Sequence, residues 1–144
     1  MPWKTIYGAQ GVEVHFSERC DGTDLLDAHE AVYEHRYEEG LQYILADFAQ
    51  VEYLDLSLAD LLRIADHDRQ YLLRNPPHLV AIVAPQAPVM GLLRTYEHYM
   101  EGSPLRTCIA NTRAEALMWL RSEMLEPVAA TYSWHLRQDP CPSA

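Results

Sequence analysis

The stretch ILADFAQVEYLDLSL, residues 44–58, decides how the rest of the chain is interpreted. Residues 41–48 are almost continuously apolar, which is typical of a strand that is buried on both faces of a sheet. A polar turn is expected next, and Ser57 and Asp60 then have the S-x-x-D form of a helix capping box. A buried strand, a turn and a helix start in succession are typical of the edge where α/β domains hold their sites.

Hydrophobic periodicity predicts further elements on both sides of this stretch. Upstream, alternation around a Gly-Ala-Gln-Gly turn predicts an antiparallel hairpin, and a helical period with Gly40 as its C-terminal cap follows. The order is ββαβαβαβα, which indicates an α/β fold with a mixed, mainly parallel sheet and helices packed on it. The predicted strands are 3–7, 12–16, 41–48, 79–84 and 106–110, and the predicted helices are 23–39, 57–74, 88–102 and a last one that begins with the Thr112–Glu115 capping box.

Length and composition indicate one folded domain. The chain has 144 residues, of which 49% are hydrophobic, enough for a single core. We expect this domain to occupy residues 1–126. Residues 127–144, which contain several prolines, are expected to form a C-terminal extension.

Net charge and cysteine usage limit the classes of partner and the compartment. The 11 basic and 21 acidic residues give a net charge of −10, which repels nucleic acid and anionic lipid surfaces. No apolar run has the length of a signal peptide or a transmembrane segment. Three cysteines without a C-x-x-C pair are more typical of a reducing compartment, so we expect the protein to be cytoplasmic.

The central stretch is similar to the signature of the STAS family, the anti-sigma factor antagonists, and most of all to its SpoIIAA-like branch. The matching positions are Asp47, Val51, Asp55 and Ser57. The resemblance implies a STAS-like fold and a non-enzymatic regulatory or protein-interaction module. It leaves the phosphorylation switch open, because Leu56 stands where the antagonists have the phosphorylated serine and Ser57 matches the next serine of the motif. The fold is also compared with the Sec14 lipid-binding domain, which implies an alternative function in binding a small apolar ligand or lipid.

Three polar residues of the central stretch are candidate binding or regulatory residues: Asp47, Asp55 and Ser57. Ser57 at a helix start is expected to act mainly as an N-cap, which contributes about 1 kcal/mol. A hydrolase that used these three residues would need a base near Ser57, and the sequence shows none. We therefore predict that the protein is not an enzyme.

A second candidate region is the helix that follows strand 79–84. Gln86 precedes this helix, and Tyr96 lies on it with apolar neighbours. These residues are expected either to line a small apolar pocket at the strand ends or to pack in the core. An elongated cavity of several hundred Å³ would favour ligand binding, whereas a filled core would favour a protein partner.

The histidines do not predict a metal centre. None of the seven has H-x-x-x-H or H-E-x-x-H spacing, so we expect neither a metal nor another cofactor. His29 falls on the apolar face of its helix and is interpreted as a packing residue. Asp66, His67 and Asp68 are interpreted as a solvated face of the next helix.

Two further features bear on protein partners. Acidic residues at helical spacing between Asp24 and Glu38 form a stripe that is either a plain soluble face or a surface for a basic partner. In the C-terminal extension Tyr132, Trp134 and Leu136 alternate with polar residues. Such a segment is expected to dock on its own domain or on a second subunit, and a homodimer is predicted.

Overall fold

The computed structural model describes residues 1–39, 42–74 and 79–125. Five strands form one sheet in the order β1-β2-β3-β4-β5. β1 pairs antiparallel with β2, and all the other neighbours are parallel. The elements are β1 (Trp3–Tyr7), β2 (Gly11–Asp21), α1 (Gly22–Glu39), β3 (Tyr43–Asp55), α2 (Leu58–Arg74), β4 (Leu79–Val83), α3 (Ala87–Tyr99), β5 (Arg106–Ala110) and α4 (Arg113–Leu125).

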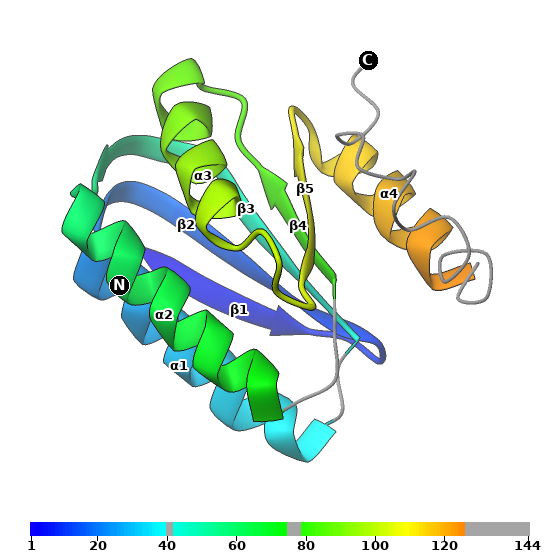
Figure 1. The fold of residues 1–144 in the computed structure, drawn as a ribbon. Helices are drawn as coiled ribbons and strands as arrows, with labels where there is room; N and C mark the ends of the chain where they lie inside the picture. The colour runs from blue at the N-terminus through cyan, green and yellow to red at the C-terminus, as the bar shows by residue number, and fades with distance from the viewer. Residues whose placement is uncertain (40–41, 75–78, 126–144) are drawn as a thin grey trace.

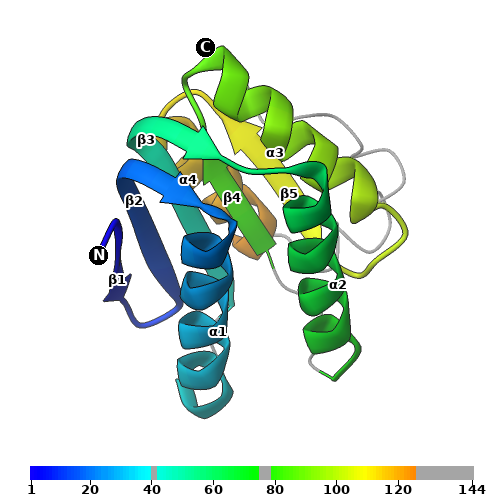
Figure 2. The same cartoon turned by 90° about the vertical axis from the view of Figure 1, so that its left-hand side faces the viewer.

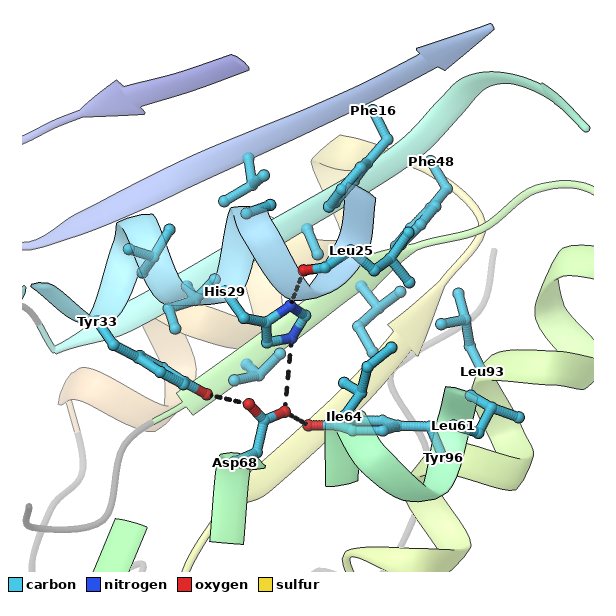
Figure 3. Close-up of a pocket in the computed structure, with 17 residues that line it drawn as sticks. Phe16, Leu25, His29, Tyr33, Phe48, Leu61, Ile64, Asp68, Leu93 and Tyr96 are labelled. Carbon is cyan, nitrogen blue, oxygen red and sulfur yellow. Dashed lines mark hydrogen bonds and ion pairs between the residues drawn. The ribbon is translucent and has the colours of Figure 1, made fainter. Parts of the chain in front are cut away.

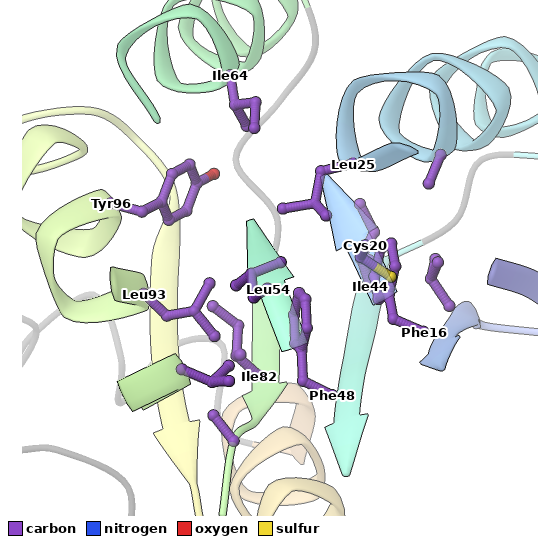
Figure 4. Close-up of a cluster of buried hydrophobic side chains, with 14 of the residues drawn as sticks. Phe16, Cys20, Leu25, Ile44, Phe48, Leu54, Ile64, Ile82, Leu93 and Tyr96 are labelled. Atoms are coloured by element: carbon purple, nitrogen blue, oxygen red, sulfur yellow. The ribbon is translucent and has the colours of Figure 1, made fainter. Parts of the chain in front are cut away.

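The helices divide into two layers on the sheet. α1, α2 and α3 lie on one face, and α4 lies on the other (Figures 1 and 2). Each layer has its own buried cluster of apolar side chains. The larger cluster is shown in Figure 4, where Phe16, Phe48 and Ile82 of the sheet lie opposite Leu25 and Ile64 of α1 and α2.

The predicted α/β fold, with its element order and mixed, mainly parallel sheet, is confirmed. Strands 3–7 and 106–110 have the predicted bounds, and the other helices and strands outside the central stretch differ at one or both ends. Gly40 and the C-terminal extension lie outside the described residues, as do the predictions that rest on them.

The central stretch departs from the prediction. The expected polar turn between Asp47 and Asp55 is wrong, because β3 continues to Asp55 and pairs along its whole length with an equally extended β2. Only Leu56 and Ser57 connect β3 to α2. Val51 and Leu54 are buried, so this part of β3 contributes side chains to the core. The polar residues around them, Gln50, Glu52 and Asp55, are exposed.

Bulges explain why the extension of β3 was not recognised. Between His15 and Ser17, and again between Glu18 and Arg19, β3 carries one residue more than β2. Each extra residue breaks the period-two alternation from which a strand is predicted. Glu18 takes a positive φ of 59°, which is unusual for a residue with a side chain.

The N-termini of α1 and α2 meet at Gly22. A Cβ atom at this position would lie 2.5 Å from Cγ of Asp60, the residue that completes the α2 capping box. Gly22 therefore permits the close approach of the two helices.

We expect Gly22→Ala to destabilise the protein by about 1–3 kcal/mol, because the methyl group forces the Asp60 side chain away from its hydrogen bonds. The measurement is urea unfolding followed by circular dichroism. Gly91→Ala is the matched control. Gly91 lies within α3 with no atom within 4 Å of the added Cβ, so this change should stabilise by about 0.5–1 kcal/mol. Equal effects of the two substitutions would contradict the prediction.

None of the helices in the described part of the chain is long and apolar enough to span a membrane.

Candidate functional site

A small cavity lies between the sheet and the three helices α1, α2 and α3. Its volume is about 50 Å³, and most of its wall is apolar. Phe16 and Phe48 stack at a centroid distance of 4.6 Å, and both line it. A pocket for a drug-sized ligand measures roughly 300–1,000 Å³. The cavity as it stands is therefore too small for a lipid, and its dimensions suit a ligand of a few atoms.

One wall of the cavity is polar (Figure 3). The Asp68 carboxylate of α2 accepts a hydrogen bond from the Tyr33 hydroxyl of α1 at 2.5 Å and another from the Tyr96 hydroxyl of α3. His29 of α1 approaches the same carboxylate, with Nε2 3.5 Å from Oδ2. Asp68 is 1% exposed, so this network joins the three helices around a buried negative charge.

Burial and hydrogen bonding act in opposite directions on this carboxylate. Burial alone raises the pKa of Asp68, but His29, His67 and the two tyrosine hydroxyls together hold the pKa below its usual range. Burial is also the main reason why the pKa values of Tyr33 and Tyr96 are raised well above 10. The network at neutral pH therefore consists of an ionised aspartate and two neutral tyrosines.

Both histidines beside Asp68 face acceptors on both sides of the ring. Nδ1 of His29 lies 2.6 Å from the Leu25 carbonyl oxygen and must donate to it, while Nε2 faces the carboxylate. His67 has Nδ1 3.9 Å from Asp68 and Nε2 3.9 Å from Glu30. Two donors are available only on a protonated imidazole. The neighbouring Asp68 carboxylate raises the pKa of His67.

The predicted site residues lie in three separate places. Tyr96 belongs to the cavity. Gln86 is the N-cap residue of α3 and makes no side-chain cap; its Nε2 donates to the Ala49 carbonyl oxygen at 3.3 Å. Asp47 accepts the Ala49 N–H at 2.8 Å, so β3 backbone connects Asp47 to Gln86.

Asp47 faces the side of the sheet that carries α4 and joins a charged cluster there. Its Oδ2 lies 3.5 Å from Nδ1 of His15, and Nε2 of His15 lies 3.0 Å from Glu13. Arg113 at the start of α4 donates to both oxygens of Glu13, at 3.0 and 2.7 Å. Arg113 is the main reason why the pKa of Glu13 is lowered. The cluster fixes the start of α4 to β2, and the sequence analysis did not identify it.

Asp55 and Ser57 lie at the far end of β3. Seven residues of strand lie between Asp47 and Asp55, a separation on the order of 20 Å, so the two carboxylates cannot share a proton. Ser57 is a cap as predicted: Oγ accepts the Asp60 N–H at 3.1 Å, and Asp60 accepts the Ser57 N–H at 3.1 Å. Among the described residues, the hydrogen bonds of the Ser57 side chain and backbone N–H at this helix start are those of the capping box.

We expect Ser57→Ala to lose about 1 kcal/mol of stability and Ser57→Asp to keep most of it, because aspartate caps a helix equally well. Thermal and urea unfolding of the two variants measure the difference. An alanine variant as stable as the wild type would contradict the cap.

The interpretation of Asp66, His67 and Asp68 as a solvated face is wrong for Asp68. Leu61, Ile64 and Asp68 follow one another at intervals of three and four and lie on the face of α2 that lines the cavity. That spacing was a signal in the sequence for a buried aspartate. His29 is a packing residue as predicted, but it also pairs with Asp68.

The comparisons with known proteins support the fold. No family model and no curated protein matches the chain. Among solved structures, the anti-sigma factor antagonist SpoIIAA in its unphosphorylated form is similar, with a TM-score of 0.53 and 10% identity over 83% of this chain and 97% of that chain. An uncharacterized Shewanella loihica PV-4 protein with a SpoIIAA-like fold has a TM-score of 0.50 and 16% identity over 82% and 91%. The chain therefore has a STAS-like, SpoIIAA-like fold.

The described residues contain no group of three or more histidine, cysteine or acidic side chains arranged to hold a metal ion.

Proposed function

We propose that this protein is a non-enzymatic regulatory module of STAS type that acts in the cytoplasm by binding a protein partner through the start of α2. The observation that carries the proposal is a pair of exposed leucines directly after the capped Ser57. Leu58 and Leu62 are 59% and 46% exposed and lie one helical turn apart. Large apolar side chains that share a face of a surface helix are typical of a recognition site. We call Leu58 and Leu62 the α2 face.

The charge around the α2 face indicates the kind of partner. Asp21, Asp24, Asp55 and Asp60 lie at the starts of α1 and α2, and the chain carries a net charge of −10. The partner that suits this surface is a basic protein with an apolar recess for the leucines. A phosphate on Ser57 would add charge beside Asp60, which already occupies the cap, so we propose binding that does not depend on phosphorylation.

The experiment compares co-purification from the source cell of tagged wild type, Leu58→Glu/Leu62→Glu and Met118→Glu. Met118 of α4 is the matched control, since it is 60% exposed and lies on the opposite side of the sheet. The proposal expects a protein that is retained by Met118→Glu, lost by the double variant, and bound more weakly at high salt.

Retention of every co-purified protein by the double variant would overturn the proposal. Light scattering of the same samples tests the alternative that the α2 face binds a second copy. In that case the double variant alone becomes monomeric, and the partner is this chain itself.

A further inference from the structure

The buried carboxylate of Asp68 lacks a permanent counter-charge. Within the described side chains, the cations that pair with it are His29 and His67, at 3.5 and 3.9 Å, both longer than a normal hydrogen bond. Histidine loses its charge between pH 5 and 8. Burying a carboxylate without a cation beside it costs free energy. When both histidines are neutral, neither of them compensates the negative charge of Asp68.

The other groups around Asp68 limit which ligands can bring a positive charge to its carboxylate. The titratable groups that face Asp68 are His29 and Tyr33 on α1, His67 on α2 and Tyr96 on α3, with Glu30 beyond His67. The sheet contributes only apolar side chains to the cavity wall. A cation that reaches Asp68 through the cavity thus meets apolar surface on its way and two tyrosine hydroxyls at its end.

We propose that the cavity between the sheet and α1, α2 and α3 is a binding site for a small aliphatic primary amine, whose ammonium group pairs with Asp68 and whose alkyl group lies among the apolar side chains. A carboxylate has about four acceptor positions, of which the two tyrosines occupy two. His29 and His67 face the same oxygens at 3.5 and 3.9 Å, beyond normal hydrogen-bond distance, so an ammonium group can still donate to them. The volume of about 50 Å³ is a third of the roughly 150 Å³ cavity that holds the six carbon atoms of benzene, so an amine of about two or three non-hydrogen atoms is the appropriate size.

Competition with the histidines gives the site a characteristic pH dependence. A small amine remains protonated up to about pH 10, as lysine does, whereas an imidazole loses its proton at a much lower pH. The ammonium group and the protonated histidines compensate the same negative charge. Amine affinity should therefore rise from pH 5.5 to pH 8.5, the opposite of what a carboxylate ligand that pairs with the histidines would show.

The test is an NMR titration of the full chain with ethylamine and with ethanol, which differs from it by the charged group. We expect millimolar binding of ethylamine, at least about tenfold tighter than ethanol at pH 8, with shifts at His29, Tyr33 and Tyr96. Asp68→Asn should bring the two affinities within about twofold of each other. Asp66→Asn is the matched control, because Asp66 is an exposed aspartate of the same helix and its loss should leave the preference unchanged.

A second variant keeps the test independent of the stability of Asp68→Asn. His67→Gln removes one competing charge beside Asp68, so ethylamine affinity at pH 5.5 should increase and its pH dependence should weaken. Equal binding of ethylamine and ethanol to the wild type, or an affinity that falls as the pH rises, would overturn the proposal. The proposal would also be overturned if Asp66→Asn lost the preference for ethylamine as fully as Asp68→Asn does. Equal losses would show that the amine is only attracted to an acidic surface.

Discussion

Asp68→Ala is expected to destabilise the protein by about 3–5 kcal/mol. The change leaves the Tyr33 and Tyr96 hydroxyls buried without their acceptor and removes the partner of His29. Removing one member of a buried charged network costs this much because the remaining polar groups lose their compensation while they stay out of water. Urea unfolding with a fixed m-value measures the loss.

Two controls separate this network from a general effect of mutating α2. Asp66→Ala, at an exposed position of the same helix, should change stability by no more than about 0.5 kcal/mol. Tyr33→Phe combined with Asp68→Ala should cost less than the sum of the single changes, because each removes the same hydrogen bond. A loss below about 1 kcal/mol for Asp68→Ala would show that the network contributes little to stability.

Leu45→Ala is expected to cost about 2–5 kcal/mol. Leu45 of β3 is fully buried in the cluster between the sheet and α4, where Leu120 of the helix is 1% exposed. Truncation removes apolar contacts and leaves a cavity that a layer built from one helix has few side chains to refill. Chemical unfolding measures this loss as well.

Leu58→Ala is the control for Leu45→Ala, since it deletes the same atoms from a residue that is 59% exposed. Its effect should stay within about 0.5 kcal/mol. Similar losses for the two leucines would contradict the assignment of Leu45 to the core. The same Leu58 variant should weaken the partner binding proposed for the α2 face, which distinguishes a surface role from a role in stability.

The candidate site was only partly accessible from the sequence. Ser57 and Asp60 were recognised as a capping box because the signal lies within four residues and needs no other part of the chain. Tyr96 was assigned to a possible pocket wall from its helical spacing, and it does line the cavity. Asp68 was missed, because the hydroxyls that satisfy its carboxylate come from positions 35 and 28 residues away in the sequence.

The sequence by itself determined the order of the elements, the mixed sheet and the helix that begins after Ser57, since periodicity and capping are local and follow the geometry of each element. The tertiary structure alone decided how far β3 extends and which polar residues are buried. The pairing of β3 with β2 through two bulges converts an apparent polar turn into strand. The convergence of α1, α2 and α3 on one side of the sheet turns Asp68 from a surface residue into the centre of a buried network, because burial depends on which faces of separate elements meet.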